Sequence, residues 1–288
     1  MNTIKLGSRD SKLAVIQTEM VMQSISVPCE LITMKTTGDM ILDKTLDKIG
    51  GKGLFVKELD RALAMKTVDF TVHSLKDMPM EQPPGLPIVA YSKREDPRDA
   101  LVLARGLTKL DLSLPIGCAS ARRRVQLQRL FPQADIRPVR GNVPPRLRKL
   151  DAGQYGALVV AAAGLHRLGV DDRIHHYFSP DEIIPAAGQG IIAVQGREGE
   201  DFSCLAKFSN ADARDCALAE RSFTRTLNGG CSAPVAAYAE LTGDVIRIIG
   251  MYVNEDETIV RFGSCKGERK QAEQLGAQLA RRLQRGED

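Results

Sequence analysis

Residues 68–79 read Val-Asp-Phe-Thr-Val-His-Ser-Leu-Lys-Asp-Met-Pro, a strand-like run followed by a polar loop. The β-branched and aromatic residues at 68–72 predict a strand that ends in this loop. Ligands of open α/β sheets bind at the carboxyl ends of strands, so Lys76 and Asp77 lie where a ligand site is expected. In a turn both side chains can face one cleft; the alternative is an exposed ion pair. The stretch therefore indicates an α/β fold with a site at a strand end.

Strand-like and helix-like segments alternate on both sides of this loop, as in α/β proteins. The charged stretch 94–99 predicts a crossover into a second lobe, and the apolar run 191–194 predicts a strand that returns from it. The other expected strands are 3–6, 29–35, 87–92, 115–117, 136–139 and 157–160. The expected helices are 12–24 with Ser11 as N-cap, 54–65, one ending near 130 and one carrying Arg146.

From residue 211 onward the pattern is that of a small α+β domain. It predicts a helix to 227, strands near 234–241, 245–253 and 258–265, and a helix at 268–284. The expected organisation is lobe 1 at 1–93 plus 190–210, lobe 2 at 94–189, and a C-terminal domain at 211–288.

The composition is that of an ordinary globular protein: 288 residues, 43% hydrophobic, 26% charged and a net charge of +4. The first residues lack the apolar core of a signal peptide, and no apolar run is long enough to span a bilayer. The six cysteines are scattered without CxxC spacing, which argues against a disulfide framework or a zinc site. We expect reduced thiols in the cytoplasm and no metal.

Basic residues follow predicted strands repeatedly, close to helix starts. Arg122, Arg140 and Arg167 each do so, and Arg9 follows the first strand beside two serines. Residues 121–149 contain eight arginines and one lysine against a single acidic residue. Such a cluster favours a polyanionic ligand, because arginine grips carboxylates bidentately.

Three kinds of polyanion could fill such a site. Aromatic residues are only 5% with no Trp, and no DNA-binding motif is visible, which argues against nucleic acid. The glycine-rich phosphate-binding motifs are absent, which argues against a nucleotide. A small organic polycarboxylate remains. Asp77 would then act as an acid, a base or the electrostatic partner of a cationic intermediate.

Residues 227–234, Leu-Asn-Gly-Gly-Cys-Ser-Ala-Pro, place Cys231 at the tip of a two-glycine loop. Local sequence leaves packing and function evenly balanced for this thiol. A cysteine nucleophile needs a histidine base, and the four histidines, His73, His166, His175 and His176, sit in no triad context. The pair His175-His176 is interpreted as surface. Covalent attachment remains as the use for Cys231.

Residues 36–53 lack periodicity and contain lysines among glycines. Such long irregular segments are uncommon unless they are lids or disordered, so a mobile lid is expected, with a plain surface loop as the alternative.

The sequence closely resembles the porphobilinogen deaminase (hydroxymethylbilane synthase) family along nearly the whole chain. The residues that carry the resemblance form long motifs in the same order. They are Gly7-Ser8-Arg9-Asp10-Ser11, residues 48–55, residues 73–79, residues 94–100, Arg140-Gly141-Asn142-Val143, residues 162–169 and Gly229-Gly230-Cys231.

The resemblance implies two periplasmic-binding-protein-like (type II) lobes with a cleft between them, plus a small C-terminal α+β domain. A dipyrromethane cofactor is expected as a thioether on Cys231. The enzyme would deaminate four porphobilinogen units, join them in turn to this primer, and release hydroxymethylbilane. The implied protein is a monomer whose partner is this small substrate, without nucleic acid or membrane.

The resemblance also implies a role for each motif residue. Asp77 would stabilise the azafulvenium-like cation formed as ammonia leaves, with Arg9 and Arg140 as further catalytic residues. The expected cofactor-binding residues are Cys231, Ser74, Lys76, Asp77, Ser120, Arg122, Arg123 and Arg146. The expected substrate-binding residues are Arg9, Ser11, Arg140, Arg146, Arg167 and Gln189. The expected lid residues are Lys48, Lys52 and Phe55.

Three places depart from the usual family pattern. Lys12 replaces a common proline, Cys118-Ala119-Ser120-Ala121 replaces Thr-Ser-Ser-Leu, and Pro144-Pro145 replaces a pair ending in Thr. We expect altered cofactor loading or substrate affinity rather than a different reaction. Two competing hypotheses are a two-lobed carboxylate binder without catalysis, which would need neither Asp77 nor Cys231, and a nucleic-acid binder with steep salt dependence.

Overall fold

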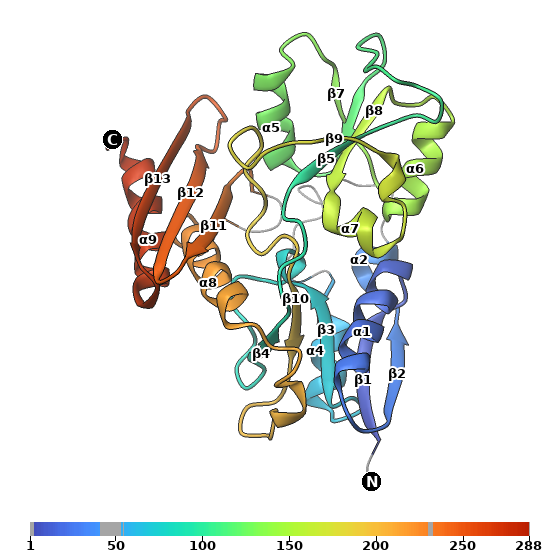
Figure 1. The fold of residues 1–288 in the computed structure, drawn as a ribbon, viewed down its shortest axis with the longest axis vertical. Helices are drawn as coiled ribbons and strands as arrows, with labels where there is room; N and C mark the ends of the chain where they lie inside the picture. The colour runs from blue at the N-terminus through green and yellow to red at the C-terminus, as the bar shows by residue number, and fades with distance from the viewer. Residues whose placement is uncertain (1–2, 41–52, 54, 230–232, 288) are drawn as a thin grey trace.

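The computed structural model describes residues 3–40, 53, 55–229 and 233–287, and the strands in this part of the chain form three sheets (Figure 1). Two sheets have five strands and the third has three. The first sheet and its helices form lobe 1, the second sheet and its helices form lobe 2, and the third belongs to the C-terminal domain. The predicted fold class, two α/β lobes followed by a small α+β domain, is confirmed.

Lobe 1 is built on a sheet with the strand order β2-β1-β3-β10-β4. Its strands are β1 (Ile4–Arg9), β2 (Cys29–Met34), β3 (Phe70–Ser74), β4 (Ile88–Tyr91) and β10 (Ile192–Gln195). The first three are parallel, and β10 runs antiparallel to both of its neighbours. The helical segments are α1 (Lys12–Ser24), α2 (Thr37–Met40), α4 (Lys57–Ala64), η1 (Leu75–Asp77) and η3 (Ser203–Leu205).

Lobe 2 repeats this arrangement with the order β7-β6-β8-β5-β9. Its strands are β5 (Asp99–Leu103), β6 (Ile116–Cys118), β7 (Ile136–Pro138), β8 (Ala157–Ala161) and β9 (Ile174–Tyr177). Its helical segments are α5 (Ala121–Leu130), α6 (Val143–Asp151), α7 (Ala162–Arg167) and η2 (Asp171–Arg173). Each lobe has one strand that runs antiparallel to its neighbours, β10 in lobe 1 and β5 in lobe 2. Each of these is the first strand that the chain forms after it crosses from the other lobe.

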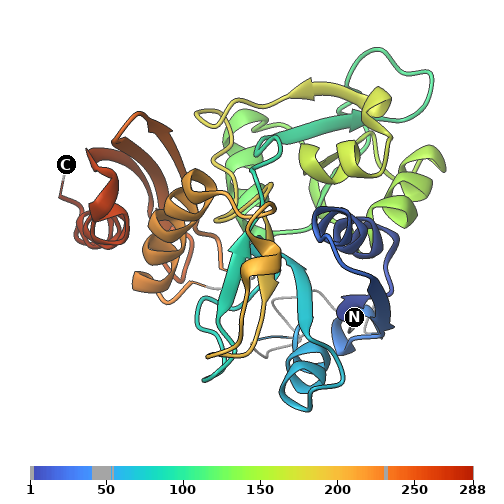
Figure 2. The same cartoon turned by 60° about the horizontal axis from the view of Figure 1, so that its bottom comes forward.

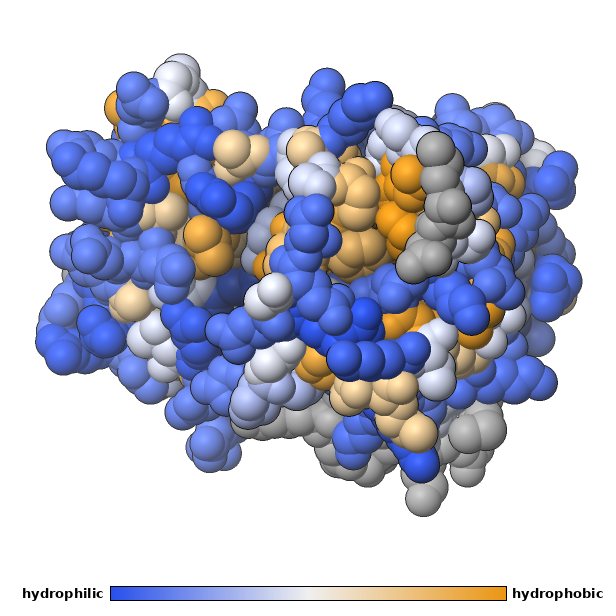
Figure 3. Space-filling model, turned by 90° about the horizontal axis from the view of Figure 1, so that it is seen from below, coloured by the Kyte–Doolittle hydropathy of each residue, from blue (hydrophilic) through white to orange (hydrophobic). Residues whose placement is uncertain are grey.

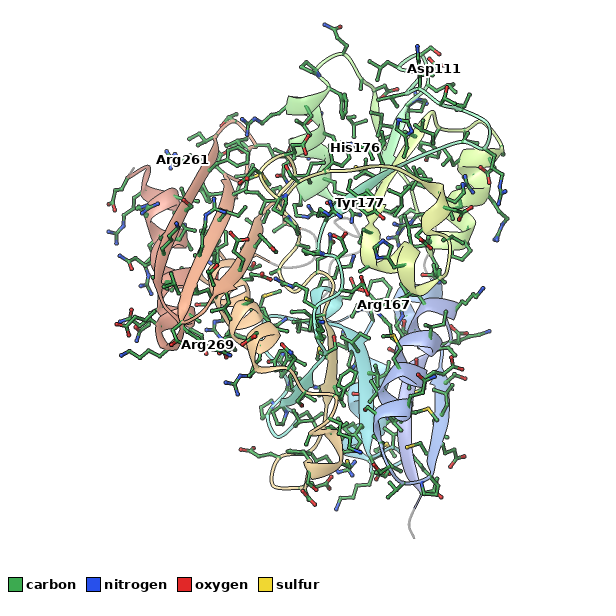
Figure 4. All side chains as sticks on the ribbon, in the orientation of Figure 1. Asp111, Arg167, His176, Tyr177, Arg261 and Arg269 are labelled. Carbon is green, nitrogen blue, oxygen red and sulfur yellow. The ribbon has the colours of Figure 1, made fainter. Side chains whose placement is uncertain are left out.

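Strands β5 and β9 were not expected from the sequence. The charged residues before Asp99 suggested a crossover and hid the strand, although residues 100–103 form a continuous apolar run, typical of a strand buried on both faces. Strand β9 is a short edge strand with a weak pattern. His175 and His176 lie on it and are exposed, which confirms their interpretation as surface residues (Figure 4).

The C-terminal domain packs two helices, α8 (Ala211–Thr226) and α9 (Ala272–Arg285), against one face of an antiparallel sheet. The sheet consists of β11 (Ala236–Thr242), β12 (Val245–Val253) and β13 (Val260–Glu268), with η4 (Arg269–Gln271) leading into α9. Phe223 is fully buried in this core. The opposite face of the sheet packs against Val125 of α5 and Ile184, so the domain rests on lobe 2.

Residues between β4 and β5, and between β9 and β10, carry the chain from one lobe to the other. Arg94 in the first segment donates to the Glu220 carboxylate of α8 at 2.6 Å. The same carboxylate accepts from the backbone N–H of Gly188 in the second segment and of Ala239 in β11, both at 2.7 Å. Fully buried, Glu220 therefore ties both crossing segments to the C-terminal domain.

The C-terminal domain lies to one side of both lobes in two views of the ribbon (Figures 1 and 2). The face seen from below is mostly hydrophilic, with hydrophobic residues in small separate areas (Figure 3). Among the described helices, none combines the length and apolar character needed to cross a bilayer.

Candidate active-site cleft

A cavity of about 230 Å³ lies where lobe 1, lobe 2 and the C-terminal domain meet. Five basic side chains and the Asp77 carboxylate line it among the described residues. They come from the ends of β1 and β3 and from the starts of α5 and α6, as expected for a site at strand ends. The basic residues are Arg9, Lys76, Arg122, Arg123 and Arg146.

Asp77 ends the short helix η1 directly after β3 and is half-buried in the cleft. In the described part of the chain, no hydrogen bond or ion pair engages its carboxylate. Burial lowers the pKa of Lys76 and of Arg146, and the negative charge of Asp77 partly opposes this; the same charge also helps to raise the pKa of Arg123, so three basic side chains lie near Asp77. The structure thus brings Asp77 to the cleft and not to an exposed ion pair with Lys76.

Lys76 is a cleft residue whose pKa depends strongly on its surroundings. Burial, and next the charge of Arg123, lower its pKa to about 8, against the opposing effect of Asp77 and Asp99. Its Nζ lies 3.4 Å from Oε1 of Gln189.

Arg122 and Arg123, at the start of α5, are buried and both donate to Asp99 at the start of β5. The distances are 2.8 Å from Arg122 to Oδ2 and 2.7 Å from Arg123 to Oδ1. Ser120 is the N-cap of α5 and accepts from the backbone N–H of Arg123. Sequence reasoning missed Asp99; its signal was a carboxylate next to an apolar strand, where an unpaired charge is costly.

Arg9 lies at the end of β1, and its guanidinium stacks over the Phe55 ring at 4.4 Å. The Phe55 ring also approaches Gly38 so closely that a Cβ there would lie 2.3 Å from a ring carbon. Ser11 caps α1 as predicted, accepting from the backbone N–H of Ala14 at 3.4 Å, and also lines the cavity.

A smaller cavity of about 70 Å³ adjoins the first and shares several lining residues with it. Arg146 and Arg167 both line it, and burial lowers the pKa of each guanidinium to about 10. Arg167 donates to the carbonyl of Gly190 at 2.6 Å and lies where α7 faces lobe 1 (Figure 4). Arg140 is half-buried and lines neither cavity, although its charge helps to lower the pKa of Arg146.

Of the remaining predicted site residues, Ser74 lies in the cleft and others fall outside the described part of the chain. Ser74 lines both cavities and exchanges hydrogen bonds with Gln17 at 2.9 and 3.1 Å. Cys231, Lys48 and Lys52 lie outside the described residues, as does most of the predicted lid. Thr224 and Ala233, which lie on either side of the cysteine loop in sequence, line the main cavity.

The departures from the family pattern lie at three helix starts, and one of them, Lys12, is the first residue of α1. Cys118 is buried and does not line the main cavity, whereas Ala119 and Ser120 do. Pro144 and Pro145 fall in the first turn of α6, where the missing N–H groups have no intrahelical partner in any case. The helix therefore forms as it would with other residues, but its amino end offers fewer N–H donors to an anion.

Comparison with known proteins agrees with this geometry. The family model for the porphobilinogen deaminase dipyrromethane cofactor binding domain matches residues 4–204, and the model for the C-terminal domain matches 215–285. The chain belongs to the porphobilinogen deaminase family. A porphobilinogen deaminase of Acetivibrio thermocellus is 54% identical over 99% of both chains, and one of Chromobacterium violaceum is 42% identical over 98% of this chain and 94% of that one.

Two solved structures of bacterial proteins resemble this fold at low sequence identity. The VFT2 domain of Bordetella pertussis BvgS has a TM-score of 0.39 and 16% identity, covering 76% of this chain and 92% of that one. A periplasmic binding protein of Salmonella typhimurium with high arginine specificity has a TM-score of 0.38 and 13% identity, covering 75% and 94%.

The porphobilinogen deaminase family carries a covalent dipyrromethane, and the cleft of this chain suits such a polycarboxylate. Nε of Arg123 and Nε of Arg167 are buried and have no hydrogen-bond partner among the described residues. Buried donors are normally satisfied, so a ligand with acceptor oxygens would suit these two guanidinium groups. Carboxylate groups supply such acceptors and match the guanidinium fork.

Proposed function

We propose that the cleft between lobes 1 and 2 holds both porphobilinogen and the dipyrromethane cofactor, with Cys231 as the thioether anchor. The family deaminates porphobilinogen, joins four units head-to-tail on the covalent primer and releases hydroxymethylbilane. The observation that carries the proposed site is the Asp77 carboxylate, set among five basic lining side chains.

The arginines of the cleft would bind acetate and propionate groups. We assign Arg123 and Arg146 to the cofactor carboxylates, together with Lys76 and Ser120, and Arg9 and Arg167 to the substrate. When bound, dipyrromethane supplies the pyrrole carbon to which the first substrate unit is joined. Burial makes each charge-assisted hydrogen bond stronger than it would be in water.

Asp77 would stabilise the positive charge that develops on the substrate as ammonia leaves. A preorganised carboxylate in a partly water-excluded site acts without reorganising during the reaction. The proposed role of Arg140 is indirect in this geometry, through its charge near Arg146.

We further propose the domain boundaries 93/94, 189/190 and 210/211, a monomer as the working unit, and a cytoplasmic location. One chain supplies every residue that the proposed site uses, which supports a monomer. Sedimentation at several protein concentrations tests this part.

Intact-mass measurement of the purified protein tests the proposed anchor. The expected result is an excess equal to two linked pyrrole units, located by peptide mapping to Cys231 and absent in Cys231→Ser. Cys118→Ser is the matched control, because Cys118 is buried outside the main cavity, and it should keep the adduct. An active protein without any adduct would overturn the proposal.

A further inference from the structure

Asp99 is a carboxylate that lies beside the cleft without lining its main cavity. It is completely buried, and its two oxygens accept three hydrogen bonds from site residues. Oδ2 accepts from Arg122 at 2.8 Å, and Oδ1 accepts from Arg123 at 2.7 Å and from Nε2 of Gln189 at 2.9 Å. One side chain therefore fixes three residues that the sequence assigned to ligand binding.

Gln189 extends this contact to lobe 1. Its Nε2 also donates to the carbonyl of Pro97 at 2.7 Å, and its Oε1 accepts from Lys76 at 3.4 Å. Because an amide has two N–H donors and both are used inside the protein, Gln189 has none left for a substrate carboxylate. The side chains of Lys76, Gln189, Asp99 and Arg123 thus form a continuous polar connection from lobe 1 to lobe 2.

The two arginines bound by Asp99 differ in what they offer to a ligand. Arg122 donates to Asp99 and also to the carbonyl of Ile184 at 2.7 Å. It therefore links α5 to the segment between β9 and β10, which is called the return segment below. Arg123 donates to Asp99 through one terminal nitrogen, while its buried Nε has no partner among the described residues. Arg123 lines both cavities, whereas Arg122 lines only the main one.

The charge of Asp99 persists over the pH range in which proteins function. Burial alone would favour the neutral acid, but the charges of Arg122 and Arg123 outweigh it and hold the pKa of Asp99 well below its usual range. A carboxylate with a lowered pKa contributes stability above its unfolded pKa, near 4, and loses that contribution only in stronger acid. The connection between the lobes is thus ionic at neutral pH.

We propose that Asp99 and Gln189 are positioning residues that hold Arg123 and Lys76 in the geometry needed to load the dipyrromethane cofactor. For Gln189 this replaces the direct substrate contact expected from the sequence. Arg122 acts within the same unit as a brace between α5 and the return segment. The inference rests on the proposed function of the cleft.

The experiment compares Asp99→Asn, Gln189→Leu and the double variant with the unaltered protein. Asp96→Asn is the matched control. Asp96 lies in the segment between β4 and β5, pairs with Arg98, and lines neither cavity. Cofactor occupancy is read by intact mass after purification and again after incubation with porphobilinogen. KM and kcat for porphobilinogen are measured on the loaded fraction, and folding is checked by circular dichroism.

We expect both single variants to load severalfold less cofactor than the control. In the loaded fraction KM should rise on the order of 10-fold, because Arg123 and Lys76 would still be present but would no longer be held in the position that binds the ligand. The double variant should lose little more cofactor occupancy than Asp99→Asn alone, since the effects of substitutions within one connected unit do not add.

Three results would overturn the inference: full occupancy with unaltered KM in folded Gln189→Leu, the same in folded Asp99→Asn, or additive losses in the double variant. If Asp99→Asn does not fold, Gln189→Leu decides, because it removes hydrogen bonds without leaving a buried unpaired charge. An unaltered protein that carries no adduct would instead contradict the proposed function itself, so the two failures are distinguishable.

Discussion

Asp77 is the residue on which the proposed chemistry depends. We expect Asp77→Ala to fold, to carry cofactor and to bind porphobilinogen with a KM within a few-fold of normal. Its kcat should fall on the order of 10²-fold or more, the usual loss when a preorganised electrostatic partner is removed. Steady-state kinetics on loaded protein test this, with Glu81→Gln as the control, because Glu81 is an exposed carboxylate on the same loop. Near-normal turnover would remove Asp77 from the mechanism.

Lys76 gives the cleft a pH dependence of its own. Burial and Arg123 lower its pKa to about 8, whereas an unfolded chain keeps lysine protonated to about pH 10.4. Between these values the folded protein binds fewer protons than the unfolded chain, so the free energy of unfolding rises with pH across this window. Below about pH 8 the ammonium is charged and available to a carboxylate.

Amine labelling of Lys76 tests this pKa in cofactor-free Cys231→Ser protein. The labelling rate, followed by peptide mass spectrometry, should rise up to about pH 8 and then level off, because only the neutral amine reacts. The exposed Lys109 provides the reference for reagent reactivity. A rate for Lys76 that still increases tenfold per pH unit through pH 9 would contradict the prediction.

At the scale of elements, the C-terminal domain depends on the close approach of α8 and α9. A Cβ at Gly276 would lie 2.1 Å from the carbonyl oxygen of Ala219, which is backbone and cannot move aside without shifting a helix. Glycine in a helix interior normally costs about 1 kcal/mol relative to alanine. At this position close packing outweighs that cost.

We therefore predict that Gly276→Ala destabilises the protein by about 1–3 kcal/mol, the usual range for overpacking. The reason is that α9 must move away from α8 and lose part of its contact with the buried Phe223. Urea unfolding monitored by circular dichroism measures the effect. Gln278→Ala, on the exposed face of α9, should leave the midpoint nearly unchanged. Greater stability in Gly276→Ala would show that the helices can separate at no cost.

At the scale of the whole molecule, Glu220 joins the crossing segments to the C-terminal domain. Glu220→Gln keeps the size of the side chain but leaves Arg94, which is mostly buried, without its charge partner. Breaking a buried pair in this way typically costs about 3–5 kcal/mol. We expect the C-terminal domain to unfold at a lower temperature than the two lobes.

Calorimetry should then show a second, earlier transition in Glu220→Gln. Glu240→Gln is the matched control, because its ion pair with Arg247 is largely exposed and such pairs contribute about 0–1 kcal/mol. An unchanged transition in Glu220→Gln would mean that apolar contacts alone hold the domain in place.

Much of the local structure could be predicted from the sequence. The helix at 12–24 with its Ser11 cap and the strand at 245–253 have the bounds that periodicity and capping indicated. The convergence of Arg9, Lys76, Asp77 and Arg122 on the main cavity also followed from their positions after strands, whereas Arg140 does not line it. These features depend on neighbouring residues, whose spacing and chemistry are visible in a single sequence.

The alternation of elements and the basic character of the cleft residues follow from the local sequence. Three features became visible only in the three-dimensional structure: β10 inserts between β3 and β4, β5 lies between β8 and β9, and Asp99 holds Arg122 and Arg123. The physical reason is that propensity acts between neighbours, whereas strand partners and buried ion pairs are selected by packing between residues far apart in the chain.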